Sequence, residues 1–415
     1  MLRERSAFAQ LGGCCCSVDF TLWLPLSRVL ILNALTILLP ILHADPARGG
    51  AERYTVDLAA GLRKRGHDVR IAASTFAADV QSPGDVVIDA GGSTRHSRYL
   101  RFLDGLDRHL ASQRYDIVHA MLPVRRCDIY HPHAGIAAAA LAGGHLKYEA
   151  ALMQAVSRVA TRLNRRRQRF GEVERTLLTG SRPPTVLCLS QYVQTTVRRH
   201  YTLADSQLAT LFNAVDLSRF DPARQPDARS EMRRELGIED DRVVALMIAN
   251  DFERKGLREA VAAVGKAADP RLLLIVVGKQ DPRPYRAMAE KIGEGKVIFA
   301  GSTADPYPLY RASDFVLLPT HHDPCSLVLL EALAMGLPAI STIFNGACEI
   351  MTDGREGFVL RDPNDAVTLA NAVRQMLDAD RRAAMSAAAL ALRPRLAYDR
   401  HLDTLEEIYR RVGRE

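Results

Sequence analysis

The segment 321–338 reads HHDPCSLVLLEALAMGLP and places two carboxylates, Asp323 and Glu331, eight residues apart. Glu331 is the one charge in a predicted helix whose other positions are apolar, and a helix that is apolar all round is normally buried. Burying a carboxylate without partners is costly. A pair of ribose hydroxyls would offset that cost, and a structural salt bridge is the alternative.

The same segment predicts a helix that begins at Leu327, after Ser326 as a candidate N-cap, and ends before Gly336. The free amides at such a helix start attract anions. A loop acid at Asp323, free amides and an acid within the helix together suit a nucleotide sugar. The sugar hydroxyls would face the loop acid, the phosphates the amides and the ribose the helix acid.

Two adjacent cations, Arg254 and Lys255, lie in the segment 250–256, NDFERKG, directly after a predicted strand. Arginine can bind phosphate oxygens with two parallel hydrogen bonds, and lysine supplies a mobile point charge. Together they could neutralise a diphosphate leaving group without a metal. The alternative is a solvated surface pair.

Paired glycines, Gly49 and Gly50, occur in the segment 45–52, DPARGGAE, before a helix predicted over 51–65. Glycines let the backbone approach a ligand closely, and the following helix start can face an anion. The spacing does not fit the dinucleotide fingerprint GxGxxG. An ordinary turn is the alternative to a ligand-binding loop.

Two histidines, His131 and His133, lie in the segment 130–135, YHPHAG, shortly after a strand predicted over 116–120. They would lie at the edge of a sheet where ligands bind. A metal site would need a third ligand, which the neighbouring sequence does not offer, so we expect no metal. Packing or turn histidines are the alternative.

Short apolar runs alternate with amphipathic helical stretches along the chain, which predicts βαβ units and parallel sheets. In such sheets ligands bind at the carboxyl ends of the strands, where each motif above is placed. Two similar α/β halves are expected to meet near residue 212. The predicted strands cover 35–42, 68–73, 116–120, 185–189, 243–249, 272–277, 296–300, 315–318 and 339–342.

The chain has 415 residues and a net charge of +7, with a basic cluster at 162–169. This length favours two domains. The charge suits an anionic partner such as phosphate groups, a nucleic acid or an acidic membrane surface, and a solvated helix face is the alternative. The seven cysteines show neither a disulfide framework nor zinc-ligand spacing, which favours a reducing cytoplasm.

The segment 20–42 is strongly apolar and would nearly span a bilayer. Its later part is predicted to be the first buried strand, and residues 1–28 are predicted to be an extension outside the fold. A signal anchor is the alternative.

The acid–x7–acid pattern of Asp323 and Glu331 resembles that of retaining GT-B glycosyltransferases of the glycosyltransferase-4 family, and is similar to bacterial lipopolysaccharide core α-glucosyltransferases. GGAE at 49–52, Asn-x-Val-Asp at 213–216 and Arg-Lys-Gly at 254–256 follow in the family's order. The resemblance covers roughly residues 40–412. Aspartate stands where the family usually has its first glutamate, which leaves the donor sugar open, and Ala214 stands where it usually has glycine.

This resemblance implies an α/β chain of the GT-B fold, with two Rossmann-like, doubly wound parallel-sheet domains facing across a cleft. Residues 1–28 would precede the fold. An acceptor domain would cover 29–212 and a nucleotide-sugar donor domain 213–395. The C-terminal helix in 396–415 would pack back on the first domain.

Carried over by position, the resemblance also implies residue roles. Glu331 would bind ribose, Asp323 the hydroxyls of the transferred sugar, and Arg254 with Lys255 the diphosphate. His133 would contact the sugar near the reacting carbon. The full set comprises Gly49, Gly50, Arg254, Lys255, Ser326, Leu327 and Glu331 as donor-binding residues, with His133 and Asp323 as catalytic residues.

The activity implied is hexosyl transfer with retention from a nucleotide-diphosphate sugar, a UDP-sugar foremost, to a glycan or lipid-linked acceptor in cell-envelope or lipopolysaccharide synthesis. No cofactor, metal or nucleic acid is expected. The location implied is the cytoplasm, with peripheral binding to the anionic inner face of the membrane. The alternatives are a non-catalytic basic α/β binding protein and a GT-B nucleotide-sugar epimerase; a phosphorylase of this fold would need pyridoxal phosphate.

Overall fold

The structure is a computed structural model that describes residues 34–133, 135–139 and 165–413. The chain divides into residues 1–34 and residues 35–415, and the account below concerns the second unit. The predicted extension 1–28 and the first part of the basic cluster 162–169 lie outside the described residues.

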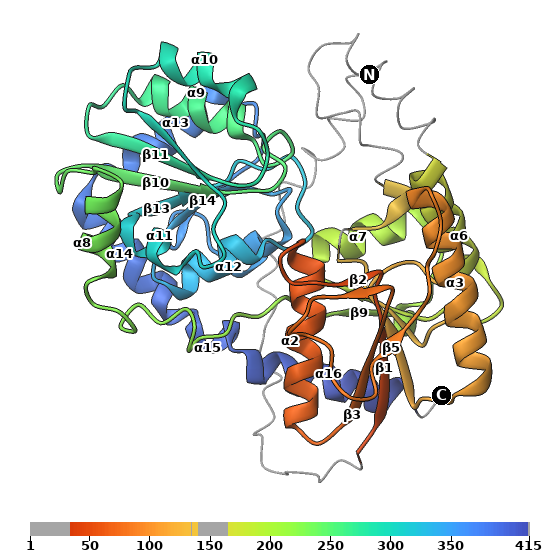
Figure 1. Cartoon of the computed structure of the whole chain (residues 1–415). Coiled ribbons are helices and arrows are strands. Elements are labelled where there is room, and N and C mark those ends of the chain that lie inside the picture. The colour runs from red at the N-terminus through yellow and green to blue at the C-terminus, as the bar shows by residue number, and fades with distance from the viewer. Residues whose placement is uncertain (1–33, 134, 140–164, 414–415) are drawn as a thin grey trace. The chain divides into compact units, whose positions relative to one another are not determined.

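A seven-stranded sheet forms the first half of this unit, in the order β5-β3-β1-β6-β7-β8-β9 with every pairing parallel (Figure 1). Its inner strand β1 reads TILLP and is buried on both faces, as expected for a parallel sheet covered on two sides. The strands are β1 (Thr36–Pro40), β3 (Asp68–Ala73), β5 (Val86–Val87), β6 (Ile117–Ala120), β7 (Ile129–Tyr130), β8 (Thr185–Cys188) and β9 (Leu208–Thr210).

Helices cover both faces of this sheet. Alternating residues of β1 separate the two layers, since Ile37 and Leu39 join one apolar cluster and Leu38 joins another. α2 (Gly50–Lys64) and α16 (Tyr398–Val412) pack in the first cluster, and α3 (Arg95–Ser112) and α6 (Arg165–Thr179) in the second. α7 (Gln191–His200) follows β8, and the short strands β2 (His43–Ala44) and β4 (Thr75–Phe76) pair separately.

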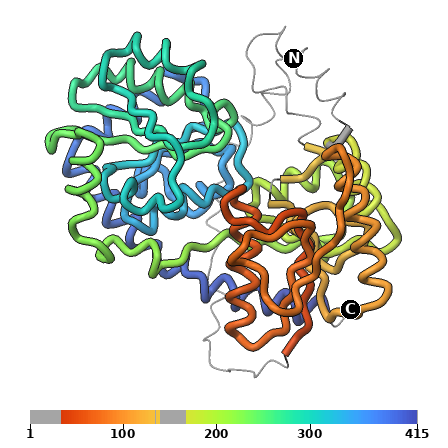
Figure 2. Tube along the Cα trace, viewed as in Figure 1, coloured from red at the N-terminus to blue at the C-terminus, as the bar shows by residue number. Residues whose placement is uncertain are grey.

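The C-terminal helix α16 returns to the first sheet, where it packs beside α2 (Figure 2). Its residues Leu402, Leu405 and Tyr409 recur at helical spacing and are buried against α2 and β1. Arg65, just after α2, binds Asp403 at 2.6 Å. The helix therefore lies beside the elements that carry the glycine loop.

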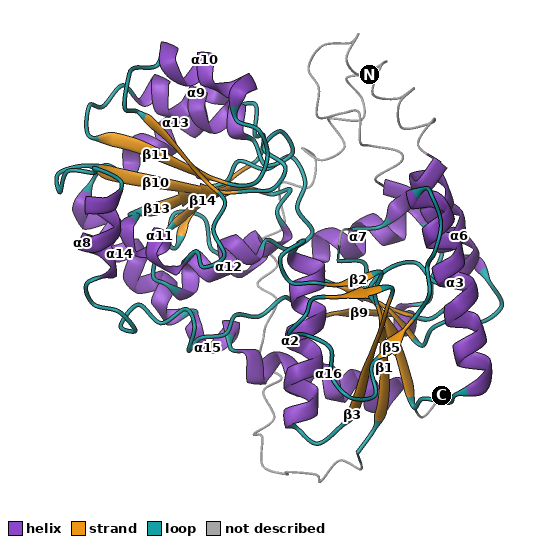
Figure 3. Ribbon diagram, in the orientation of Figure 1, coloured by secondary structure: helices purple, strands orange, loops and turns teal. Residues whose placement is uncertain are grey.

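A six-stranded sheet forms the second half, in the order β12-β11-β10-β13-β14-β15, also wholly parallel (Figure 3). This order is the doubly wound Rossmann order. The strands are β10 (Val243–Ile248), β11 (Leu272–Val277), β12 (Val297–Gly301), β13 (Phe315–Leu317), β14 (Ala339–Thr342) and β15 (Gly357–Leu360). The helical elements of this half are α8 (Ala228–Glu235), α9 (Leu257–Ala267), α10 (Arg283–Lys291), α11 (Tyr307–Ala312), α12 (Leu327–Ala334), η2 (Gly346–Ile350), α13 (Ala366–Gln375), α14 (Ala379–Ala391) and α15 (Arg393–Leu396), whereas η1 (Asp205–Gln207) precedes β9 in the first half.

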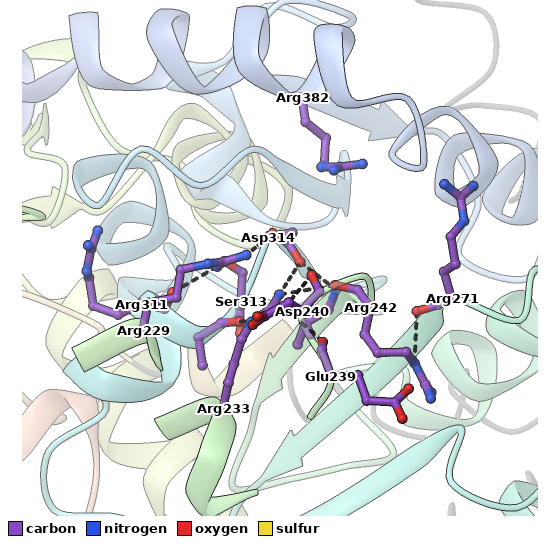
Figure 4. Close-up of polar contacts among 12 residues, drawn as sticks. Arg229, Arg233, Glu239, Asp240, Arg242, Arg271, Arg311, Ser313, Asp314 and Arg382 are labelled. Atoms are coloured by element: carbon purple, nitrogen blue, oxygen red, sulfur yellow. Dashed lines mark hydrogen bonds and ion pairs between the residues drawn. The ribbon is translucent and has the colours of Figure 1, made fainter. Parts of the chain in front are cut away.

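A buried ion-pair network fastens α8 to the amino ends of β10 and β13 (Figure 4). Asp314 accepts hydrogen bonds from Arg233 at 2.9 Å, from Arg229 at 2.8 Å and from the amide of Val244 at 2.7 Å. The Arg233 side chain is 3% exposed. Its remaining donors reach the carbonyl oxygens of Ala312, Glu239, Asp240 and Arg242.

The predicted fold class is confirmed: both sheets are parallel and doubly wound. All nine predicted strands are present, and the sequence missed β15 and the short strands of the first half. We propose a domain boundary near residue 212, since β9 ends the first sheet at Thr210 and β10 opens the second at Val243. Within the described ranges, no helix is long and apolar enough to cross a membrane.

Candidate functional site

Helix α12 has one open face. Leu327, Val328 and Glu331, which share that face at helical spacing, are half-buried, whereas the opposite positions Leu329, Leu330, Ala332 and Leu333 are fully buried. The expectation of a helix buried all round is therefore wrong on this face. Two apolar side chains and a carboxylate are presented together, which suits a ligand with an apolar part and hydroxyl groups.

Within the described part of the chain, the Glu331 carboxylate accepts one hydrogen bond, from the hydroxyl of Tyr310 on α11 to Oε2 at 2.7 Å. Among the described residues no lysine or arginine pairs with Glu331, which counts against the structural salt bridge. Burial raises the pKa of Glu331 to about 7, although the Tyr310 hydroxyl and the charges of Arg219 and Arg53 favour the ionised form. The group is thus poorly compensated and able to accept further hydrogen bonds.

Asp323 forms an ion pair with Lys255, and both side chains are largely buried. The loop that carries Asp323 is held by its amide, which donates to the carbonyl of Phe344, and by its carbonyl, which accepts from the amide of Gly346. Burial and the neighbouring Arg254 lower the pKa of Lys255. The structure therefore joins the predicted sugar-binding acid directly to one of the predicted phosphate-binding cations.

Arg254 precedes Lys255 in the loop after β10 but makes different contacts. Its guanidinium donates to the carbonyl of His322 at 2.8 Å and to Asp251 at 3.3 Å. Gly256 follows with φ +80°, and a Cβ there would come 2.1 Å from the carbonyl oxygen of Pro319, so only glycine fits. The loops after β10 and β13 are thereby locked together.

Ser326 occupies the N-cap position of α12, but its side chain makes no capping hydrogen bond. Its Oγ is buried and has no hydrogen-bond partner among the described residues. The side-chain amide of Asn213 donates to the carbonyl of Cys325 at 2.9 Å, and its Oδ1 is likewise buried without a partner in that part of the chain. Ser326 is therefore the N-cap residue as predicted, but without a side-chain hydrogen bond to a described residue, and the start of α12 keeps unused polar groups.

The glycine loop meets α12 at its start. A Cβ on Gly50 would lie 3.6 Å from Cδ1 of Leu327. Lys279, after β11, donates to the carbonyl of Ala47 at 2.6 Å and fixes the loop against the second half. Gly49 has an extended backbone and precedes α2 as its N-cap residue. The structure thus brings together Gly50 and Leu327, two of the residues predicted to bind the donor.

His131 and His133 belong to a larger histidine cluster than the sequence suggested. Their ring centroids lie 4.1 Å apart, and His119 from β6 stacks on His131 at 5.2 Å. His401 from α16 contacts the ring of Tyr54, which in turn lies 4.1 Å from His133. No set of residues in the described ranges is arranged to hold a metal ion.

His322 and Tyr192 are site residues that sequence reasoning missed. Nδ1 of His322 lies 2.7 Å from the hydroxyl of Tyr192, and burial lowers the pKa of His322 to about 4. A Cβ on Gly135 would come 3.1 Å from Nε2 of His322. The adjacent histidines His321 and His322, which open the segment 321–338, were the sequence signal from which His322 could have been predicted. Through these contacts the loop after β7 reaches the loop that carries Asp323.

A carboxylate from the second half caps a helix of the first. Glu349 of η2 accepts from the amides of Gln191 at 2.8 Å and Tyr192 at 2.7 Å, at the start of α7. The hydroxyl of Ser190 donates to the carbonyl of Pro324 at 2.7 Å. These contacts join the halves directly beside the Asp323 loop.

We expect Glu349→Gln to lower the free energy of unfolding by about 1 kcal/mol, because the amide nitrogen replaces one acceptor oxygen at an exposed helix start. The measurement is the thermal transition followed by circular dichroism. Glu294→Gln, at an exposed carboxylate after α10, is the matched control. Equal stability of the two variants would show that the cap contributes nothing.

Two Rossmann-like domains with glycine loop, cations and paired acids at the carboxyl ends of their strands define the GT-B class. Two family models match: "Glycosyltransferase Family 4" over residues 48–219 and "Glycosyl transferases group 1" over residues 228–391. The chain belongs to the GT-B glycosyltransferases that combine these two domains.

Curated relatives cover most of the chain. The lipopolysaccharide glucosyltransferase WaaG of Escherichia coli K12 is 25% identical over 79% of this chain and 86% of that protein. A probable transglycosylase of Burkholderia thailandensis is 30% identical over 80% of this chain and 82% of that protein.

Solved structures share the fold. WaaG superposes with a TM-score of 0.73 at 24% identity, over 86% of this chain and 95% of that one. Anabaena HepE in complex with UDP-glucose superposes with a TM-score of 0.66 at 20% identity, over 90% and 100% of the two chains.

Proposed function

We propose that this glycosyltransferase moves a hexosyl group, with retention and without a metal, from a nucleotide-diphosphate sugar to a glycan or lipid-linked acceptor in lipopolysaccharide core synthesis. The observation that carries the proposal is the open face of α12, where Glu331 forms no ion pair with any described residue and lies beside two half-buried apolar side chains. WaaG's name supports the pathway, and the UDP-glucose complex of HepE supports a UDP-sugar donor.

The proposed donor site assigns one part of the ligand to each group. Glu331 accepts from the two ribose hydroxyls, which supply the hydrogen bonds its buried carboxylate lacks. The diphosphate lies at the start of α12, near Gly50 and Arg254, where free amides and a cation favour negative charge. Asp323 and His133 face the transferred sugar.

The proposed chemistry is electrostatic. As the bond to the sugar breaks, negative charge gathers on the leaving diphosphate, and Arg254, Lys255 and the α12 amides stabilise it. Asp323 is neutralised by Lys255, so it is poorly suited to act as a free nucleophile. Attack by the acceptor on the face that the diphosphate leaves, assisted by that phosphate, accounts for retention as the family resemblance implies.

The acceptor proposal rests on charge. The basic cluster 162–169, whose described part lies at the start of α6, could hold a phosphorylated lipid headgroup at the anionic membrane surface. Binding to vesicles that contain anionic lipid, and its loss at high salt, is the corresponding measurement.

The test of the donor site is a screen of UDP-, GDP- and ADP-glucose by thermal shift, with wild type, Glu331→Gln and Glu290→Gln compared. A donor at about a hundred times its Kd stabilises the native state by about 2.7 kcal/mol. We expect one nucleotide to stabilise the wild type and the control Glu290→Gln, which lies at an exposed position of α10. Equal responses of wild type and Glu331→Gln would contradict the ribose assignment.

The same screen separates the alternatives. A non-catalytic basic binding protein would respond to no nucleotide sugar. An epimerase would convert the donor's sugar with no acceptor present, whereas a transferase releases nucleotide slowly by hydrolysis and quickly when acceptor is added.

A further inference from the structure

Glu174 of α6 carries a buried carboxylate to which the transfer chemistry above gives no role, and the residue is 0% exposed. Its Oε2 accepts from the hydroxyl of Tyr130 at 2.6 Å and from the amide of Ala137 at 2.7 Å. Its Oε1 accepts from the hydroxyl of Tyr201 at 2.9 Å and from the amide of Ala138 at 3.0 Å. Each oxygen thus accepts from one hydroxyl and one backbone amide.

These four hydrogen bonds fill the acceptor capacity of the Glu174 carboxylate, which is about two per oxygen. All four donors are uncharged groups, and such bonds are what a carboxylate needs when it is buried. Burial, followed by the charge of Glu174, raises the pKa of Tyr130 and of Tyr201, so both hydroxyls keep their protons and donate. The carboxylate therefore holds four groups at one point.

Three of the four donors lie at the two ends of one segment, residues 131–136, which we call the histidine loop and which the structure describes except for residue 134. Tyr130 ends β7 directly before this loop, and Ala137 and Ala138 follow it. Tyr201, directly after α7, is the partner outside this segment. Glu174 thus connects the residue before the histidine loop to the residues after it.

The start of the histidine loop is also held by the sheet. The amide of His131 donates to the carbonyl of Ala120 on β6 at 2.8 Å. The ring of His131 stacks on His119, whose Nδ1 lies 2.7 Å from the hydroxyl of Tyr409 on α16. The two amides after the loop are bound by Glu174 instead, so weakening that carboxylate should release the far end of the loop first.

The far end of the histidine loop is the part that meets the candidate site. A Cβ on Gly135 would come 3.1 Å from Nε2 of His322 and 3.5 Å from Cγ of Pro324. These two residues flank Asp323 in the sequence. Because the loop approaches so closely, its displacement would change the position of His133 relative to Asp323.

We propose that Glu174 is a positioning residue for the transfer reaction, whose carboxylate fixes the histidine loop so that His133 faces the transferred sugar beside Asp323. The inference rests on the proposed function for its ligand, and on the four hydrogen bonds for the fixing of the loop. Glu174 does not touch the donor. A misplacement of about 1 Å at reacting groups can lower a rate on the order of a hundredfold, so a buried group that sets a loop position acts on turnover.

Glu174→Gln distinguishes the two kinds of partner. The amide oxygen of glutamine replaces one carboxylate oxygen, and its NH₂ group takes the place of the other. A tyrosine hydroxyl can rotate and accept from this group, whereas the backbone amide of Ala137 or Ala138 can only donate. One of these two amides therefore loses its acceptor. Tyr201→Phe is the matched control, because it removes a donor from the same carboxylate and leaves both loop amides bound.

Hydrogen exchange of the protein without ligand measures the fixing of the loop. We expect amides within 135–139 to exchange about tenfold faster in Glu174→Gln, which corresponds to one lost hydrogen bond, and at the wild-type rate in Tyr201→Phe. Mass spectrometry of peptides that cover this segment gives the rates. Equal exchange in Glu174→Gln and wild type would show that the carboxylate does not fix the loop.

Turnover of UDP-glucose is the second measurement. We expect Glu174→Gln to lower kcat by about tenfold and to change the KM for UDP-glucose by less than about twofold, because the proposed nucleotide contacts lie outside the histidine loop. Tyr201→Phe should stay within about twofold of wild type in both constants. A purely structural role would lower the thermal transition of both variants and leave kcat unchanged well below it, which would refute the positioning role.

Glu174→Asp is the second variant if Glu174→Gln does not fold, since it keeps the acceptors on a side chain too short to reach all four donors. Its kcat should lie below that of Tyr201→Phe at equal KM, and equal kcat values would contradict the proposal. The proposed function and this inference fail differently. If wild type turns over no nucleotide sugar, the proposed function fails while hydrogen exchange still reports on the loop. If UDP-glucose is turned over and the Glu174 variants keep the wild-type kcat, only the present inference fails.

Discussion

Replacing Glu331 with glutamine is expected to lower kcat/KM for the nucleotide-sugar donor by about ten- to a hundredfold, the value of hydrogen bonds to a charged group. The carboxylate can accept from both ribose hydroxyls, whereas the amide offers one acceptor oxygen and a nitrogen that donates. The Tyr310 hydroxyl already uses Oε2, so the loss falls on the contacts to the ligand. Steady-state kinetics with varied donor measure it.

The same residue predicts a pH dependence. Because burial raises the pKa of Glu331 to about 7, the ionised form that accepts both hydroxyls becomes scarce below that pH. Donor kcat/KM of the wild type should therefore fall from pH 8 to pH 6, and Glu331→Gln should lack that limb of the profile. An identical limb in both proteins would assign it to another group.

The free energy of unfolding should change with pH in the opposite direction to donor kcat/KM, and fall as the pH rises. The folded-state pKa of Glu331 lies above its ordinary value of 4.5, so the native state binds the proton more tightly than the unfolded state. The stability contributed by the protonated group is fully present below pH 4.5 and is lost as pH rises toward 7. Glu331→Gln should thus be about 1–3 kcal/mol more stable than wild type at pH 8 and nearly equal at pH 4.5. Denaturant titration at the two pH values tests this.

Replacing Arg233 with methionine is expected to lower the free energy of unfolding by about 3–5 kcal/mol, because Asp314 and four carbonyl oxygens lose their buried donor. The six-stranded half should unfold about 10 °C earlier on heating. Circular dichroism follows that transition. Donor affinity measured well below it should be retained, since Arg233 lies at the amino ends of the strands.

Arg229 is the matched control for this network. It binds the same Asp314, but its side chain is 40% exposed, so Arg229→Met should cost about 1 kcal/mol or less. If Arg233→Met is as stable as Arg229→Met, burial of the guanidinium is not what makes the network important. Removing both charges with Arg233→Met and Asp314→Asn should recover part of the loss, because no buried charge is left without a partner, and Arg229, which also binds Asp314, is 40% exposed.

The fold could be predicted because its signals are local. Runs such as 272–277, LLLIVV, are too short and too apolar for anything but buried strands, and β11 covers those residues. The strand 357–360 was missed because Gly357 opens it with φ +145°, and a glycine weakens a strand pattern. Its backbone approach to Ala339 depends on the neighbouring strand, which the local sequence does not reveal.

The candidate site could be located from sequence, but its contacts could not. Asp323 and Glu331 are close in sequence and drew attention by their spacing. Their partners are distant: Lys255 is 68 residues before Asp323, and Tyr409 is 290 residues from His119. Such pairings follow from how the sheets are wound. The open face of α12 was missed for a related reason. In the sequence, an apolar side chain that faces a ligand cannot be distinguished from one that faces a core.

The ion pair between Lys255 and Asp323 means that the candidate site contains its own counter-ion for the lysine. On the proposed assignment, an arriving diphosphate competes with Asp323 for the ammonium, and the carboxylate is freed to accept from the sugar. When the nucleotide departs, Asp323 forms its ion pair with Lys255 again. Binding and release become exchanges between two anions, so donor affinity should depend only weakly on ionic strength, and product release should not require an exposed positive charge to be left behind.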